Sequence, residues 1–424
     1  MTGEPRVTLF QWIRAFRRCF SLFVCLMLVW LASGCETRDR SNPFDPENPE
    51  TEGQPRVLNA IAGDESVVLR WDLKGLDDPL GLRLLREVAG VRSLLLEEDE
   101  VMSGEFLDSS LPNDVEVRYH LEVQSPDGTW LSTVPDTATP GATRAWVGDA
   151  IGGGLTRLAP DGRDVLREVS FGDFLDMEVE LDGTVWAPNW SQGEILELDR
   201  EGEILQRFEH RGGNTIAIDR VTGQIWIGSF GAGALSRYDR EGKQLWHFGK
   251  AGPVEDVAPA RGKEGGIWAA IRFSGILRIF NDGIQDRWDQ FNWPVSISED
   301  EGGHLWVVDR ATQKISKILV STTGEVLESP AVFADPVDGT PDGEGGYWVA
   351  DPGRRGLVHL DAEAREVEFL AVGKVTGVTF DPRSERLWIV LREEGRVATL
   401  NLAGEELSSV TVGGSPVRVE GNWP

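Results

Sequence analysis

Apolar and polar residues alternate in short runs along most of the chain, and turns rich in glycine and aspartate separate the runs. Glu116–Gln124 and Gln244–Gly249 follow the two-residue period of a strand with one buried face. Apolar runs with a helical period are few. The pattern therefore predicts an all-β protein built from short antiparallel strands.

A tryptophan recurs about every 40 residues through the later part of the chain, each time after a turn and at the start of an apolar run. The unit Asn214–Gly249 divides into four short strands joined by tight turns. A repeat of this length with four strands is typical of a propeller blade. The recurring tryptophans are Trp146, Trp186, Trp226, Trp268, Trp306, Trp348 and Trp388.

The first repeat lacks a leading strand, whereas the chain ends in Pro416–Glu420, which matches Pro294–Glu299. We therefore expect a seven-bladed β-propeller over residues 143–424, closed by the C-terminal strand so that no edge stays unpaired. Because each tryptophan has a fixed offset from a turn, we expect packing between blades. The alternative, an aromatic binding ladder, is less favoured.

Residues 56–139 show a different arrangement of short strands, including Ser66–Leu73, Leu80–Val88 and Glu116–Gln124. Trp71 on an early strand and Tyr119 within Glu105–Gln124 resemble the corresponding features of a fibronectin type III domain, a β-sandwich. That resemblance implies core packing for both side chains. It also implies a spacer or adhesion module without catalytic residues.

Residues 1–34 read as a bacterial lipoprotein signal peptide, with Arg14, Arg17 and Arg18 as the positive region before the apolar run Cys19–Leu31. The string Leu31–Cys35 resembles a lipobox, which implies lipidation of Cys35, and the alternative is an ordinary secretory signal cut near Ala32. Cys35 would then be the single cysteine of the mature chain, which excludes an internal disulfide. Residues 35–55, rich in Pro, Asp and Glu, predict an extended tether.

This reading predicts a cell-envelope protein held on a membrane through its lipid anchor. Glu36, rather than Asp, follows the lipidated cysteine, which favours the outer membrane over the inner. The chain carries 42 basic and 70 acidic side chains, a net charge of −28. Nucleic-acid binding is therefore disfavoured, because it requires clustered positive charge.

The repeats Pro294–Asp309 and Tyr347–Asp351 resemble NHL and related propeller repeats of secreted bacterial lipoproteins. More distantly, they resemble virginiamycin B lyase and the regucalcin-type lactonases. The resemblance implies the fold more strongly than the activity, because such propellers include binding modules, lyases and metal-dependent hydrolases.

In such a ring, the starts of the first strands and the loops after the tryptophan strands meet on one face. Aromatic and arginine side chains mixed with carboxylates suit recognition of a protein or glycan by a monomeric binding protein. The alternative is a solvated acidic surface. The candidate binding residues are Asp176, Asn189, Trp190, Asn214, Phe230, Glu255, Arg272, Phe273, Trp293, Arg310, Asp335 and Arg354.

An enzyme remains the second hypothesis, either lyase-like or lactonase-like. The lyase resemblance implies histidines on that face, but all five histidines are predicted elsewhere. A calcium site could use oxygen ligands from Asp176, Asn214, Glu255 and Asp335. We expect no cofactor, with calcium as the alternative, and we name no catalytic residue.

Overall fold

The computed structural model describes most of the chain after residue 42. The predicted signal peptide, the lipidation site Cys35 and much of the tether lie outside the described residues. Apart from one 3-10 turn, Arg392–Glu394, all regular structure in the described part is strand, which confirms the all-β class. No helix within it is long and apolar enough to cross a membrane. The described residues are 43–45, 48, 51–73, 80–99, 103–113, 115–142, 145–170, 172–262, 264–280, 283–320 and 323–422.

The first eight strands form two antiparallel sheets around a common core. Leu69 and Trp71 from one sheet share that core with Leu84 and Tyr119 from the other. The Tyr119 hydroxyl donates to the Asp108 carboxylate over 2.9 Å, so its buried polar atom is satisfied. One sheet is β1 (Leu58–Gly63), β2 (Ser66–Asp72) and β5 (Ser103–Ser109); the other is β4 (Val91–Asp99), β3 (Gly81–Val88), β6 (Val117–Gln124), β7 (Trp130–Ser132) and β8 (Asp136–Ala138).

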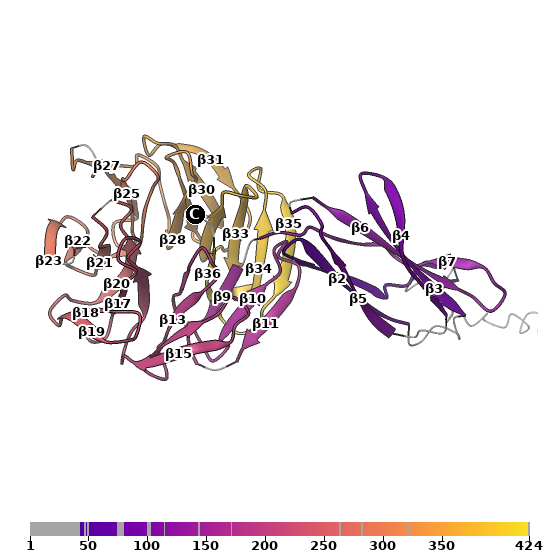
Figure 1. The fold of residues 1–424 in the computed structure, drawn as a ribbon. Coiled ribbons are helices and arrows are strands. Elements are labelled where there is room, and N and C mark those ends of the chain that lie inside the picture. Colours follow the sequence, from indigo (N-terminus) through magenta and orange to yellow (C-terminus); the bar gives the residue numbers. More distant parts are fainter. Residues whose placement is uncertain are drawn as a thin grey trace, which may run out of the picture.

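Seven four-stranded antiparallel sheets follow within the described residues 145–422. In Figure 1 they are arranged around a common centre, and β1 to β7 lie to one side of them. This arrangement is a β-propeller. The sheets, each given from its inner to its outer strand, are: β36 (Pro416–Gly421), β9 (Ala145–Asp149), β10 (Leu155–Leu158), β11 (Val165–Val169); β12 (Glu178–Val179), β13 (Val185–Asn189), β14 (Glu194–Leu198), β15 (Ile204–Glu209); β16 (Thr215–Ile218), β17 (Ile225–Ser229), β18 (Ala234–Tyr238), β19 (Gln244–Phe248); β20 (Val254–Pro259), β21 (Ile267–Ile271), β22 (Gly275–Phe280), β23 (Gly283–Trp288); β24 (Pro294–Glu299), β25 (Leu305–Asp309), β26 (Lys314–Ile318), β27 (Val326–Glu328); β28 (Asp338–Pro341), β29 (Tyr347–Asp351), β30 (Gly356–Leu360), β31 (Glu366–Leu370); and β32 (Gly377–Asp381), β33 (Arg386–Leu391), β34 (Arg396–Leu400), β35 (Glu406–Thr411).

The repeated tryptophan lies on the second strand of every one of these sheets, and all seven side chains are buried. Trp306 shows the packing in detail. Its ring stacks on Tyr347 of the next sheet with ring centres 4.9 Å apart, and its indole N–H donates to Asp300 over 3.2 Å. The tryptophans therefore pack between sheets and do not form an exposed aromatic ladder.

The last strand of the chain completes the sheet that contains the first tryptophan. Strand β36 pairs antiparallel with β9, with Val419 opposite Val147 and Glu420 opposite Trp146. Strand β9 therefore has a hydrogen-bonded neighbour on both sides, β36 and β10. This is the pairing that the match between Pro416–Glu420 and Pro294–Glu299 predicts.

The N-terminal sheets attach to one end of the propeller. The Arg163 guanidinium, in the turn between β10 and β11, donates to the Thr137 carbonyl and hydroxyl over 2.5 and 2.6 Å. The Asn422 amide, just after β36, donates to the Ala142 carbonyl over 3.3 Å. We call this end of the propeller the lower face. Because neighbouring strands run antiparallel, the turns that follow the tryptophan strands lie at the opposite end, which we call the upper face.

Candidate functional site

A pocket of about 410 Å³ opens on the upper face, and we call it the aromatic pocket. The inner strands and the turns after the second strands supply its lining. Five of the predicted binding residues meet there, namely Asp176, Trp190, Asn214, Phe230 and Glu255.

Asn214 positions one of these aromatic side chains. Its side-chain oxygen accepts from the backbone N–H of Phe230, and its amide donates to the Val254 carbonyl over 3.2 Å. The residue therefore joins the turn after β17 to the start of β20. Both polar atoms of the amide are used in holding the pocket wall.

Four predicted residues form an alternating row beside the pocket, which we call the aromatic–arginine ladder: Phe230, Arg272, Trp293 and Arg310. The Arg272 guanidinium lies 4.7 Å from the Phe230 ring centre and 4.2 Å from that of Trp293. The Arg310 guanidinium also lies over Trp293, 5.5 Å from its ring centre. Such distances are within the range of cation–π attraction.

Two carboxylates fix the arginines of the ladder. Arg310 donates twice to Asp335, over 2.7 and 3.0 Å, and Arg272 forms an ion pair with Glu255. Fork-shaped pairs of this kind hold a guanidinium in one orientation. Glu255 and Asp335, which the sequence also offers as calcium ligands, therefore serve as arginine partners here.

The corresponding loops of three consecutive sheets expose aromatic side chains around this ladder. Trp190 follows β13, Phe230 follows β17 and Phe273 comes two residues after β21. Their exposed fractions are 53%, 39% and 73%. Phe273 also has a positive φ of 63°, a conformation that is uncommon for residues other than glycine.

Two predicted binding residues have other roles in the structure. Asn189 is buried, with 1% exposure, and its side-chain oxygen accepts from Ser191 and from the backbone of Gln192. It closes its own turn and offers no surface. Arg354 pairs with Glu366 over 2.7 and 2.8 Å and covers the Phe369 ring. It therefore lies against the outer strand β31 and does not line the aromatic pocket.

A second pocket, of about 650 Å³, adjoins the first, because Val337, Thr376 and Val417 line both. We call it the basic pocket. Its charged lining residues are Arg310, Asp335, Arg355, Lys374, Arg392 and Glu393. Arg355, the neighbour of the predicted Arg354, lines this pocket from a turn in which its own φ is 62°.

Below the upper face, aspartates on alternate sheets link the inner strands. Asp176 accepts from the backbone N–H of Ile216 over 2.9 Å, and Asp256 accepts from that of Ile297 over 2.8 Å. Asp338 repeats the contact with Val378 over 3.0 Å. Each carboxylate thereby joins its own sheet to the next one.

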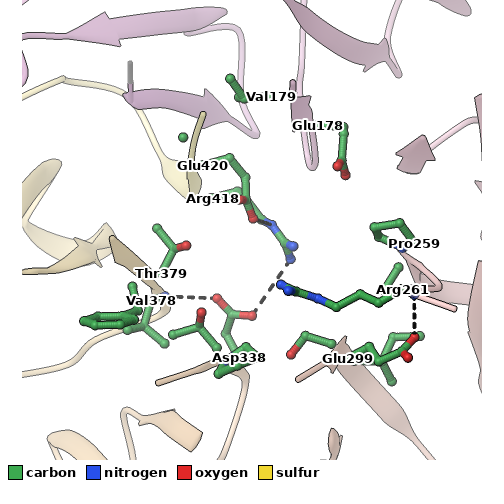
Figure 2. A pocket seen from close by; sticks show the side chains of 18 of the residues that line it. Glu178, Val179, Pro259, Arg261, Glu299, Asp338, Val378, Thr379, Arg418 and Glu420 are labelled. Carbon is green, nitrogen blue, oxygen red and sulfur yellow. Dashed lines mark hydrogen bonds and ion pairs between the residues drawn. The ribbon is translucent and has the colours of Figure 1, made fainter. Parts of the chain in front are cut away.

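Arg418, from the C-terminal strand, points toward Asp338, one of these three carboxylates, as Figure 2 shows. Its Nε lies 3.2 Å from Asp176 Oδ1 and 3.0 Å from Glu420 Oε1. Burial alone would lower the pKa of Arg418, but the surrounding carboxylates raise it well above the ordinary value. The cation therefore stays charged and partly offsets the repulsion among the acids.

The carboxyl groups around Arg418 hold their protons more tightly than exposed carboxyls do. Burial raises the pKa of Asp256 and of Glu420 to about 7. Burial and nearby Glu420 raise the pKa of Glu178 to about 8. Glu178 and Glu420 line a lower cavity of about 170 Å³ together with Arg418 (Figure 2), whereas Asp256 lines the aromatic pocket.

Within the described residues, no group of three or more His, Cys, Asp or Glu side chains is arranged to hold a metal ion. His210, just after the outer strand β15, contacts the Tyr238 hydroxyl over 2.7 Å and the Ser229 hydroxyl over 3.1 Å. Ser229 is 1% exposed, so this pair belongs to the packed interior. It is not arranged as an accessible nucleophile and base.

Two of these features escaped the sequence reasoning, which did not select Asp338 or Arg418. A signal existed for the first, because Asp176, Asp256 and Asp338 recur at about twice the blade repeat. Arg418 gives no such signal. Its importance follows from the pairing of β36 with β9, which brings the end of the chain to the centre.

No protein-family model matches this sequence, and no curated protein sequence matches it. Among solved structures, a streptogramin B lyase is similar with a TM-score of 0.50 at 19% identity, covering 58% of this chain and 86% of the lyase chain. Apo AztD from Citrobacter koseri gives a TM-score of 0.51 at 9% identity, covering 66% of this chain and 98% of the other. At these identities the likeness is one of fold alone, and it supports the β-propeller.

Proposed function

We propose that this protein is a lipid-anchored binding protein of the cell envelope, whose upper propeller face captures a protein or glycan. In this proposal the seven sheets are the seven blades of a closed ring, and β1 to β8 form a fibronectin type III-like spacer. The lipidated Cys35 and the tether hold the molecule on a membrane, with the outer membrane favoured. The protein acts as a monomer.

The aromatic–arginine ladder is the observation that carries this proposal. Glu255 and Asp335 hold its arginines in place before any partner arrives, so little side-chain entropy remains to be lost on binding. Aromatic and arginine side chains dominate the binding energy of many interfaces. The exposed rings of Trp190 and Phe273 extend the same surface.

The position of the N-terminal sheets is consistent with this role. They attach at the lower face through Thr137 and Ala142. The tether precedes them in the chain, so a partner can approach the upper face without meeting the attached domain. The spacer and tether would place that face away from the membrane.

An envelope capture experiment tests the proposal. The full chain, immobilised through its C-terminus, should retain a partner that the double variant Trp190→Ala/Phe273→Ala loses. Trp130→Ala is the matched control, because Trp130 lies on the N-terminal sheets beneath Arg83. Equal retention by the double variant, with loss in Trp130→Ala, would move the binding surface to the N-terminal sheets and contradict the proposal.

A thermal-shift measurement with calcium separates this function from a calcium-dependent hydrolase. The hydrolase would need free carboxylates, whereas Glu255 and Asp335 are engaged by Arg272 and Arg310. We expect no change in melting temperature on adding calcium. A rise of several degrees that Glu255→Ala abolishes would favour the enzyme.

A further inference from the structure

We infer that the basic pocket binds a carboxylate-bearing saccharide. This inference rests on the proposed function, because it assigns a ligand class to the same upper face. The basic pocket has more cationic than acidic side chains. The pocket has four cationic side chains, Arg310, Arg355, Lys374 and Arg392, against two carboxylates, Asp335 and Glu393, in a chain whose net charge is −28.

Two of the four cations have no acidic partner among the described residues. Arg310 is paired with Asp335, and Lys374 with Glu393 over 2.8 Å. Arg392 donates to the Ser415 hydroxyl over 2.7 Å, a neutral contact, and Arg355 has no ion pair in the described part of the chain. Both guanidinium groups therefore keep an uncompensated charge and N–H donors for an anion.

The ligand must match both the guanidinium donors and the size of the pocket. Guanidinium groups bind planar carboxylates through paired hydrogen bonds, and two of them on one pocket favour a ligand with more than one carboxylate. The pocket volume of about 650 Å³ is within the range of small-molecule sites. A short chain that continues into the aromatic pocket would meet both regions.

The aromatic pocket distinguishes a saccharide from an acidic peptide. Its polar lining includes the carboxylates of Asp176, Glu255 and Asp256, which are hydrogen-bond acceptors. Sugar hydroxyls supply donors to such acceptors, and the faces of Trp190 and Phe230 offer apolar surface to a sugar ring. A glutamate-rich peptide has no side-chain hydroxyls to donate to these acceptors, so it would use the aromatic pocket less well than a saccharide that carries both carboxylates and hydroxyls.

Calorimetric titration of the full chain tests this assignment. The ligands are trigalacturonate, a hyaluronan tetrasaccharide and sialyllactose, each paired with a neutral oligosaccharide of the same length, together with triglutamate. We expect at least one acidic saccharide to bind and its neutral counterpart to bind about tenfold more weakly or worse. Binding should also weaken as salt increases.

Single variants locate the site. Arg355→Ala and Arg392→Ala should each weaken binding of the acidic saccharide about tenfold or more. Arg365→Ala is the matched control, because Arg365 pairs with Asp361 and Glu363 in a turn at the opposite end of the same sheet. It should leave affinity unchanged.

Three results would overturn the inference: no acidic saccharide binds, triglutamate binds equally well, or both arginine variants bind like the parent. The envelope capture experiment keeps this failure separate from failure of the proposed function. Capture that depends on Trp190 and Phe273 but not on Arg355 and Arg392 would leave the upper face as the binding surface and reject the acidic saccharide.

Discussion

Arg418 Nε lies 3.2 Å from Asp176 Oδ1, so a residue of the last strand forms an ion pair with the start of the second sheet. Arg418 stands on β36, which also pairs with β9. The last strand therefore contributes to the propeller in two ways. Its backbone pairs with the edge of the first sheet, and the Arg418 side chain places a positive charge at the centre of the propeller. The stability of the whole propeller should therefore depend on β36.

Removal of residues 416–424 should destabilise the entire propeller. It would leave β9 with an unpaired edge and would remove the only cation that the described residues place among Asp176, Asp338 and Glu420. We expect aggregation in size-exclusion chromatography and loss of a cooperative melting transition. Removal of residues 423–424 alone is the control. A 416–424 deletion that melts at the parent's temperature would show that closure does not depend on β36.

Trp306→Ala should lower the free energy of unfolding by about 3–5 kcal/mol, because it leaves a cavity between two sheets. It also removes one of the donors to the Asp300 carboxylate, which keeps its ion pair with Lys317. Trp190→Ala is the matched control, since that ring is 53% exposed and should cost far less. Urea unfolding of both variants measures the difference. Similar losses in the two variants would contradict the packing role of the repeated tryptophan.

Stability should fall as pH rises toward 8, because of the buried carboxyl groups beside Arg418. Burial raises the pKa of Glu420 from its ordinary value of 4.5 to about 7. The folded chain then holds this proton more tightly than the unfolded chain, so the stability it contributes is complete below pH 4.5 and is lost as pH rises through about 7. His210 acts oppositely at lower pH, since burial lowers its pKa to about 4.

Glu420→Gln separates these contributions. The melting temperature of the variant should decline less than that of the parent between about pH 6.5 and 8.5. The contribution of His210 should be the same in both proteins. Glu405→Gln, in an exposed turn, is the control. Parallel pH profiles for Glu420→Gln and the parent would show that Glu420 does not titrate in this range.

Cys35→Ser should release the protein from the membrane fraction, because the proposed lipid anchor would be attached to the thiol of this residue. Fractionation of cells followed by a salt wash is the measurement. Cys25→Ser lies within the predicted signal peptide and is the control, which should leave attachment unchanged. If the Cys35→Ser protein stays with the membranes after the wash, the lipobox interpretation is wrong.

The sequence predicted the strands of the propeller because each repeat carries local signals, a turn and then a tryptophan that must be buried. The same periodicity placed Trp190, Phe230, Arg272 and Trp293 on one face, since their positions follow from where strands end. It could not distinguish Arg354 from Arg355, because a single residue at positive φ decides which side chain enters the pocket.

Asn189 shows a second limit of sequence reasoning. An amide side chain at the end of a strand can face a ligand or can close its own turn, and the sequence alone does not distinguish these two roles. Here the side chain closes its turn and is buried. The role of Arg418 was hidden for a different reason, because its partners Asp176 and Asp338 are distant in sequence and meet only in the folded ring.

Hydrogen–deuterium exchange of the full chain, with and without the partner retained in the capture experiment, locates the binding surface. Exchange should slow in the upper turns Trp190–Gly193, Phe230–Gly233 and Arg272–Ser274 when the partner is bound. Exchange should stay unchanged in the lower turns Asp199–Glu203 and Asp239–Lys243. Protection confined to those lower turns or to residues 56–139, with the upper turns unaffected, would contradict the upper face as the binding surface.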